Sequence, residues 1–210
     1  MWLNFKLEEQ LKEIPKHILL RASLGDAEAF ETIYQLASGF VYSIALRITN
    51  NPEDAQDVTQ DVFIKIYKNL KNFKFFSSFK TWVYRITVNT ALNTCREISR
   101  QISQRADHDS LASHQGEGDP MTEIAAERAD HERLIMDLLA VLNPDQRACI
   151  VLREIEGLNY REISEVLNIN INTVRSRLKR AREALLAYRK SEVMKDELPK
   201  DTAVAVSRLP

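Results

Sequence analysis

The sequence is poor in the residues that interrupt helices or build cysteine-based sites. Its 210 residues include only five glycines, six prolines and two cysteines. This scarcity of Gly and Pro disfavours a turn-rich β sandwich and favours long helices. Cys95 and Cys149 form no C-x-x-C motif, so we expect two reduced thiols rather than a disulfide framework or a zinc site.

Long hydrophobic runs are also missing. No stretch reaches about 18 unbroken apolar residues, so we expect no membrane span. Charged side chains are scattered through residues 6–13, where a secretory signal would be apolar. We therefore expect a cytoplasmic protein. With 44% hydrophobic residues the chain can still fill a core.

The formal net charge of −1 hides a strong segregation of charge. Residues 1–64 carry five basic and ten acidic side chains, whereas residues 65–100 carry eight basic and one acidic. Residues 105–132 are acidic again, with two basic against eight acidic, and residues 143–190 are basic, with ten against six. Two separate basic blocks indicate two contacts with a polyanion.

A polar stretch between the basic blocks predicts two domains. Residues 105–119 have no hydrophobic period and end at Pro120, as a linker does. We expect an all-α chain in two small helical domains joined by a flexible acidic linker. The expected bounds are an N-terminal extension at 1–14, a first domain at 15–97, a linker at 98–128, a second domain at 129–190 and a disordered tail at 191–210.

The first domain contains a clear helix start at Asn51 and Pro52, a capping residue followed by proline at the first helical position. One apolar stripe follows at helical spacing: Ala55, Val58, Val62, Ile66 and Leu70. Asp57, Gln60 and Asp61 fall off that stripe. They form either a solvated polar face or an acidic docking patch for a basic partner.

Aromatic and basic residues alternate just after this helix. Seven of the sixteen aromatic residues lie between Tyr67 and Tyr84. Rings interleaved with Lys and Arg suit single-stranded nucleic acid, because bases stack on rings and phosphates attract cations. We expect Phe79, Val83 and Ile86 to be core, and Phe75 and Phe76 to lie in an exposed loop. Three further polar side chains share one side of an expected helix at 79–96, namely Arg85, Asn89 and Arg96; a solvated face is the alternative.

The second domain has the spacing of a helix-turn-helix. Four helices are expected at 131–142, 145–156, 160–167 and 173–188, with a short connection between the last two. In the last helix Val174, Leu178, Ala181 and Leu185 form the expected buried stripe, and the basic side chains lie on the exposed faces. The N-terminal part of such a helix normally enters the major groove of DNA. In the connection that precedes this helix, we expect Asn172 to take the left-handed turn conformation.

Six motifs, in order and correctly spaced, resemble bacterial RNA polymerase sigma factors of the sigma-70 family, in the extracytoplasmic-function (ECF), sigma-E-like group. They are GDAEAF at 25–30, DAQDVTQDVF at 54–63, FKTWVYRITVN at 79–89, LNPDQR at 142–147, REIEGLNYREI at 153–163 and TVRSRLKRAR at 173–182. The resemblance covers about residues 22–97 and 124–187.

The resemblance implies a promoter-specific initiation factor that is not an enzyme and needs no cofactor or metal. It implies that the first domain is sigma region 2 and the second is region 4. Core RNA polymerase would be bound by Asp57, Gln60 and Asp61. The minus-10 element would be bound by Lys74, Phe75, Phe76, Ser77, Ser78, Trp82, Arg85, Asn89 and Arg96. The minus-35 element would be bound by Arg153, Thr173, Arg175, Ser176, Lys179 and Arg180. The partners implied are core polymerase, promoter DNA and an anti-sigma factor, possibly membrane-anchored.

Two departures from the family pattern stand out. Asp61 replaces the more usual Glu, and residues 74–78 (KFFSS) replace a smaller loop that contains Gly or Asp. The second departure leaves open which base the loop receives. The competing interpretations are a helix-turn-helix regulator that binds duplex DNA alone and a helical enzyme. The enzyme has little support, because the four histidines have no metal-ligand spacing and no phosphate loop or nucleophile motif is present.

Overall fold

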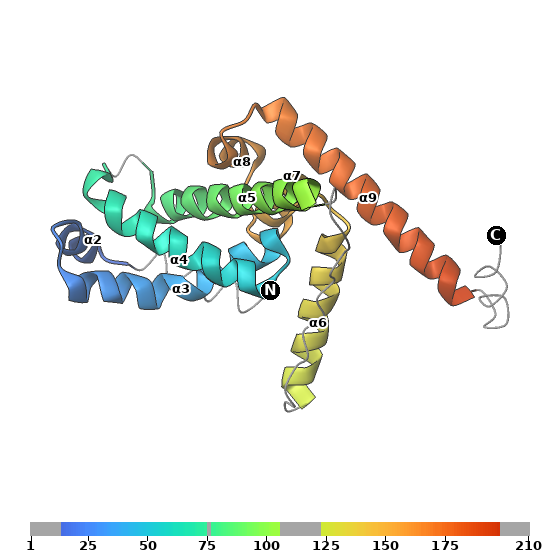
Figure 1. Cartoon of the computed structure of the whole chain (residues 1–210), viewed down its shortest axis with the longest axis horizontal. Helices are drawn as coiled ribbons and strands as arrows, with labels where there is room; N and C mark the ends of the chain where they lie inside the picture. Colours follow the sequence, from blue (N-terminus) through green and yellow to red (C-terminus); the bar gives the residue numbers. More distant parts are fainter. Residues whose placement is uncertain (1–13, 75–76, 106–122, 198–210) are drawn as a thin grey trace.

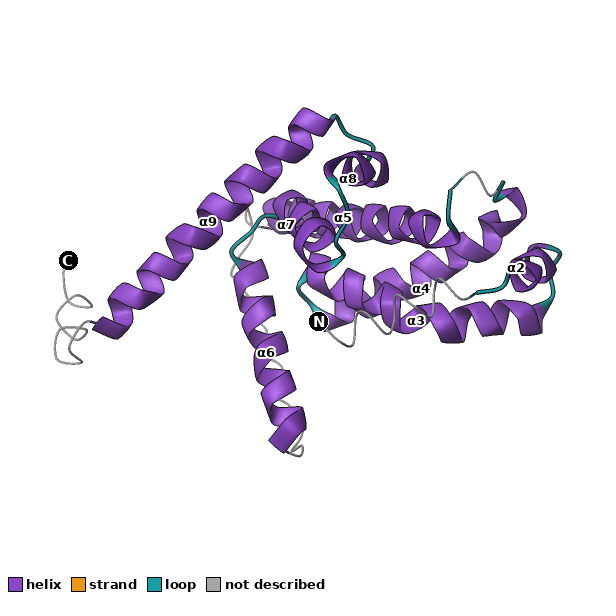
Figure 2. Cartoon of the chain, turned by 180° about the vertical axis from the view of Figure 1, so that it is seen from behind, coloured by secondary structure: helices purple, strands orange, loops and turns teal. Residues whose placement is uncertain are grey.

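The computed structural model of the chain describes residues 14–74, 77–105 and 123–197. All regular elements in these residues are helical, as expected (Figure 2). They form two lobes, which we call the first lobe (residues 16–105) and the second lobe (residues 123–197). None of the helices in these ranges combines the length and apolar character needed to cross a membrane.

The first lobe is built on three long helices that pack along one another (Figure 1). They are α3 (Ala27–Thr49), α4 (Pro52–Asn69) and α5 (Phe79–Arg105), with α2 (Lys16–Ser23) beside α3 and a 3-10 turn, η1 (Leu70–Asn72), after α4. The predicted start of α4 is confirmed: the Asn51 side chain accepts hydrogen bonds from the backbone N–H groups of Glu53 (2.8 Å) and Asp54 (3.1 Å). The whole predicted stripe of α4 is buried.

The second lobe consists of α6 (Glu123–Ala140), α7 (Pro144–Ile150), α8 (Tyr160–Leu167) and α9 (Ile171–Glu197). A π-helical segment, η2 (Val151–Ile155), continues α7. Asn143 and Asn159 each cap the next helix in a reciprocal capping box. Val174, Leu178 and Ala181 of the predicted α9 stripe are buried, and Leu185 is half-buried.

The left-handed residue before the last helix is Asn168, at φ 51°, so our assignment of that role to Asn172 is wrong. Asn172 lies inside α9, where its backbone N–H donates to the Asn170 side chain at 2.8 Å. The reversal of direction falls at the end of α8, and an asparagine adopts positive φ there at lower cost than most residues.

The helices extend beyond the expected domain bounds. In the range expected to be linker, α5 continues to Arg105 and α6 begins at Glu123. In the range expected to be tail, α9 continues to Glu197. The remainder of both ranges lies outside the described residues.

The two lobes contact each other through α5, which packs against α7 and α8 (Figures 1 and 2). The Tyr84 hydroxyl of α5 donates to Oε2 of Glu156 at 2.5 Å, and the guanidinium of Arg47 in α3 lies 3.8 Å from Oε1 of the same carboxylate. Glu156 is buried, and these two partners from the other lobe offset part of the cost of burying its carboxyl group.

A second buried ion, Arg147, also joins the lobes. Its guanidinium donates to the carbonyl oxygens of Leu139 (2.9 Å), Leu142 (2.9 Å) and, across the interface, Ile48 (2.8 Å). Burial lowers the pKa of Arg147, because removing the cation from water disfavours the charged form. The three carbonyls compensate for part of that cost.

Candidate nucleic-acid interface

A groove of about 470 Å³ runs between α4 and α5 of the first lobe. Three of the predicted minus-10 residues line it, namely Trp82, Arg85 and Asn89. The other lining residues are Lys65, Asn69, Asn72, Ile86, Thr90 and Asn93. Two cations, an indole and several amides therefore face one groove, which is the combination that binds phosphates, base faces and base edges.

The indole of Trp82 is held by two other rings. Its centroid lies 5.1 Å from that of Phe73 and 5.8 Å from that of Phe79. Phe79 is buried, as predicted, and Phe73 and Trp82 are half-buried. A ring that is fixed in this way loses little conformational entropy when a base stacks on it.

The loop that precedes α5 is only partly described. Phe75 and Phe76 lie outside the described residues. Lys74 and Ser78 are exposed, and Ser77 is half-buried. The Ser78 hydroxyl accepts a hydrogen bond from the backbone N–H of Thr81 at 3.0 Å, so in this structure it caps the first turn of α5.

Arg96 lies in a different place from Arg85 and Asn89. It shares their side of α5, but its Nη2 lies 3.4 Å from Oδ1 of Asp145 in the second lobe. It lines a separate cleft between the lobes. The structure therefore brings together Trp82, Arg85 and Asn89, and leaves Arg96 apart from them.

Five polar groove residues were not predicted from the sequence: Lys65, Asn69, Asn72, Thr90 and Asn93. The Lys65 ammonium donates across the groove to Oγ1 of Thr90 at 3.0 Å, which positions its charge between α4 and α5. A signal for three of them was present, because positions 65, 69 and 72 have the spacing of one helix face.

The predicted polymerase-binding residues lie on an exposed face of α4. Asp57, Gln60 and Asp61 are all exposed, as is Ile64 one turn further along, at 49%. Burial raises the pKa of Asp54 at the edge of this face, and the nearby Asp57 and Glu53 carboxylates raise it further. The face therefore combines negative charge with an exposed apolar side chain, a composition suited to a basic amphipathic partner.

The helix-turn-helix of the second lobe presents a basic surface on α9. Arg175, Ser176, Lys179 and Arg180 are exposed and Thr173 is half-buried. The Arg175 guanidinium donates to Oδ1 of Asn172 at 2.8 Å, and Lys179 lies 3.8 Å from Glu183 one turn on. These exposed contacts are weak enough to be exchanged for DNA.

Arg153, the remaining predicted minus-35 residue, is half-buried and engaged within its own lobe. Its Nη1 donates to the carbonyl of Leu158 at 2.9 Å, and its guanidinium lies 5.4 Å from the ring centroid of Tyr160. It supports the turn that leads into α8. Among the described residues no group of histidine, cysteine and carboxylate side chains could hold a metal ion.

Comparison with known protein families identifies both lobes. Residues 33–101 match the family model described as Sigma-70 region 2, and residues 132–185 match Sigma-70, region 4. The first match contains the α4–α5 groove, and the second contains α8 and the N-terminal part of α9.

Curated proteins extend this similarity to most of the chain. The ECF RNA polymerase sigma-E factor of Haemophilus influenzae is 33% identical over 186 residues, covering 85% of this chain and 96% of that protein. The RNA polymerase sigma-H factor of Pseudomonas aeruginosa is 35% identical, covering 83% of this chain and 93% of that protein.

Solved structures show the same fold. The sigma factor RpoE from Bartonella quintana, solved in complex with the anti-sigma factor NepR, superposes with a TM-score of 0.55 at 21% identity and covers 82% of this chain and 100% of that one. CnrH, in complex with the cytosolic domain of CnrY, gives a TM-score of 0.56 at 23% identity, with 85% and 99% coverage. With both lobes matched and sigma-E factors more than 30% identical over most of its length, the chain belongs to the ECF group of sigma-70 family RNA polymerase sigma factors.

Proposed function

We propose that the groove between α4 and α5 holds the melted non-template strand of the minus-10 element, while α9 reads the minus-35 duplex. The observation that carries this proposal is the convergence of Lys65, Trp82, Arg85 and Asn89 on one groove. Trp82 offers a face for stacking, and the two cations lie where a phosphate backbone would pass. The second lobe supplies an independent basic helix for the duplex.

The energetics require a larger assembly. Opening about ten base-pair steps costs roughly 14 kcal/mol. A base stacked on one aromatic ring returns only about 1–3 kcal/mol. The chain therefore captures bases that the polymerase has helped to open, and it performs no catalytic step of its own.

The central experiment is transcription with purified core polymerase. We expect the chain to start transcripts at a cognate promoter, and Asp57→Ala combined with Asp61→Ala to lower the yield by weakening polymerase binding. An active preparation that never stimulates initiation would exclude this function. Tight sequence-specific binding of duplex DNA without polymerase, measured by gel shift, would instead favour a regulator that acts alone.

The role of α9 is tested by Arg175→Ala and Lys179→Ala. Both should weaken binding to upstream duplex, by about 1–3 kcal/mol where an Arg pairs with a guanine, and leave polymerase binding intact. Arg189→Ala provides a matched control, because Arg189 is an exposed arginine further along the same helix. Unchanged promoter use in both test variants would remove α9 from the proposal.

The groove is tested by Asn93→Ala and Lys65→Gln. The polymerase complex of either variant should bind a single-stranded minus-10 oligonucleotide more weakly than the unaltered complex, while duplex binding through α9 stays the same. Equal affinity for the oligonucleotide in all three proteins would show that the strand takes another path.

We further propose that an anti-sigma factor restrains this chain. Two structural neighbours were solved with such proteins or with a partner's cytosolic domain. The exposed acidic and apolar face of α4 offers a surface that an inhibitor and the polymerase would compete for. Competition between the two partners in a pull-down would test this; simultaneous binding would contradict it.

A further inference from the structure

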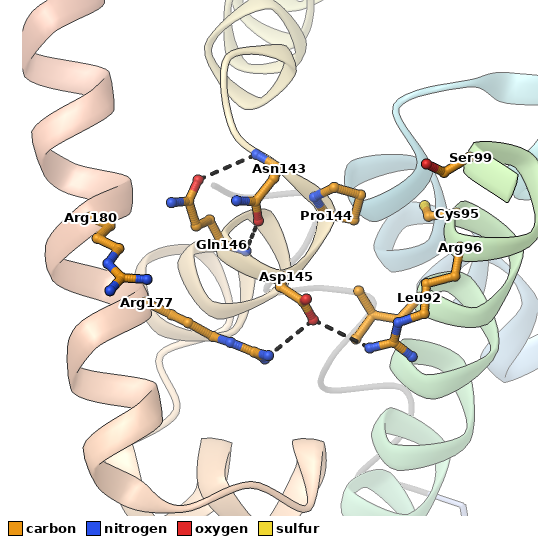
Figure 3. Close-up of a pocket in the computed structure, with 10 residues that line it drawn as sticks. All are labelled: Leu92, Cys95, Arg96, Ser99, Asn143, Pro144, Asp145, Gln146, Arg177 and Arg180. Atoms are coloured by element: carbon orange, nitrogen blue, oxygen red, sulfur yellow. Dashed lines mark hydrogen bonds and ion pairs between the residues drawn. The ribbon is translucent and has the colours of Figure 1, made fainter. Parts of the chain in front are cut away.

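The cleft between the lobes has features that DNA recognition by either lobe does not require. Its volume is about 380 Å³. One wall is α5 of the first lobe, and the other is formed by the start of α7 together with α9 (Figure 3). Leu92 and Pro144 give it an apolar part, and three guanidinium groups surround it.

The charge of the cleft is unbalanced. Oδ1 of Asp145 lies 3.4 Å from Nη2 of Arg96 and 3.2 Å from Nη1 of Arg177 (Figure 3). Arg180 also lines the cleft, and within the described parts of the chain it makes no hydrogen bond or ion pair. One carboxylate thus faces three guanidiniums, which leaves a formal excess of two positive charges.

We propose that this cleft binds a free small molecule that carries two or more linked phosphate groups. Guanidinium groups match phosphate oxygens with paired, parallel hydrogen bonds, and they remain charged at any physiological pH. Two linked phosphates place several oxygens within reach of separate arginines. The volume lies within the range of small-molecule sites.

The ligand would join the two lobes. Arg96 belongs to the first lobe, and Arg177 and Arg180 belong to the second. An anion held by both sides adds a contact that exists only while the lobes are packed together. By mass action it therefore stabilises the packed arrangement. This inference extends beyond promoter binding. Arg96 and Arg180 are also among the predicted promoter contacts, so the ligand and promoter DNA would compete for these two side chains.

The test uses the full chain and inorganic pyrophosphate, with binding followed by calorimetry at low salt. Arg180→Gln should bind pyrophosphate about tenfold more weakly, because it removes one charged hydrogen-bond donor. Arg189→Gln is the matched control, and it should bind as the unaltered chain does. Asp145→Asn should bind more tightly, since among the described residues that line the cleft it removes the only carboxylate that competes with the ligand.

A second measurement locates the ligand. The Cys95 thiol lines the cleft and is half-buried, whereas Cys149 is fully buried. Pyrophosphate should slow alkylation of Cys95 in the unaltered chain, and not in Arg180→Gln. A single-stranded oligonucleotide provides the other arm of the comparison.

The outcomes separate clearly. Pyrophosphate binding that is lost in Arg180→Gln and retained in Arg189→Gln, with protection of Cys95, supports the proposal. Absence of binding at millimolar pyrophosphate, or equal binding by Arg180→Gln, overturns it. Protection of Cys95 by the oligonucleotide alone also overturns it, because the site would then belong to a nucleic-acid backbone.

Discussion

Asparagine residues cap several helices of this chain. Asn51, Asn143 and Asn159 cap the starts of three helices, and Asn168 ends the last of these, α8, at positive φ. Each cap satisfies backbone N–H groups that have no partner within the helix. The start of the helix-turn-helix thus depends on a single side chain, that of Asn159.

Replacing the cap of α8 should cost measurable stability. The Asn159 side chain accepts from the N–H groups of Arg161 (2.9 Å) and Glu162 (3.1 Å). Asn159→Ala should lower the free energy of unfolding by about 1 kcal/mol, because both donors lose their acceptor. Asn159→Ser keeps a capping oxygen and should lose much less. Urea denaturation measures both; an equal loss in the two variants would contradict the capping role.

The Cys149 thiol should respond to pH only in an alkaline range. Burial raises its pKa from 9.0 to about 11, opposed by the nearby Arg177. The folded state therefore favours the protonated thiol. The associated stability is fully present below pH 9.0 and is lost as pH rises through about 11. At pH 8, mass spectrometry should show alkylation of Cys95 well before Cys149 in the native protein, and both together in urea; rapid native labelling of Cys149 would refute this.

At the scale of the element, hydrophobic period predicted the helices well. The stripe of α4 and most of the stripe of α9 are buried as expected, because a helix buries whichever face carries its apolar residues. The π-helical turn at Val151–Ile155 was missed, since one extra residue in a turn barely alters a short hydrophobic pattern. The C-terminal ends of α5 and α9 were also missed, because those turns carry polar residues without a capping signal.

Two leucines of α9 offer a direct test of its buried face. Leu178 is fully buried and Leu186 is 56% exposed. Leu178→Ala should cost about 2–5 kcal/mol through lost contacts and the cavity left behind. Leu186→Ala should stay within about 0.5 kcal/mol. Similar losses in chemical denaturation would place the wrong face of α9 in the core.

At the scale of the whole molecule, local pattern was a weaker guide. The spacing on α5 correctly put Arg85, Asn89 and Arg96 on one side of a helix, but it could not show that Arg96 contacts the second lobe while Arg85 and Asn89 line the α4–α5 groove. The roles of Arg147 and Glu156 were likewise hidden, because their partners across the interface are distant in the sequence. Arg147 is 99 positions from Ile48, and Glu156 is 72 positions from Tyr84. Such pairings depend on how the lobes dock.

Removing the buried hydroxyl at the interface should weaken that docking. Tyr84→Phe leaves the Glu156 carboxylate without the donor at 2.5 Å and should lower the free energy of unfolding by about 1–3 kcal/mol. Tyr188→Phe is the control, since Tyr188 is a half-buried tyrosine on α9. If both changes leave the denaturation midpoint unaltered, the hydrogen bond contributes nothing to stability.

The bond from Arg147 to the Ile48 carbonyl has a consequence for chimaeras assembled from related chains. A main-chain acceptor is present whatever side chain stands at position 48, so a donor lobe from a relative that retains the arginine would still find it. The Tyr84–Glu156 hydrogen bond differs, because it needs a hydroxyl donor at position 84 and a carboxylate acceptor at position 156. A chimaera made from lobes of two relatives would therefore tolerate a different side chain at position 48. It would need both Tyr84 and Glu156 to be retained.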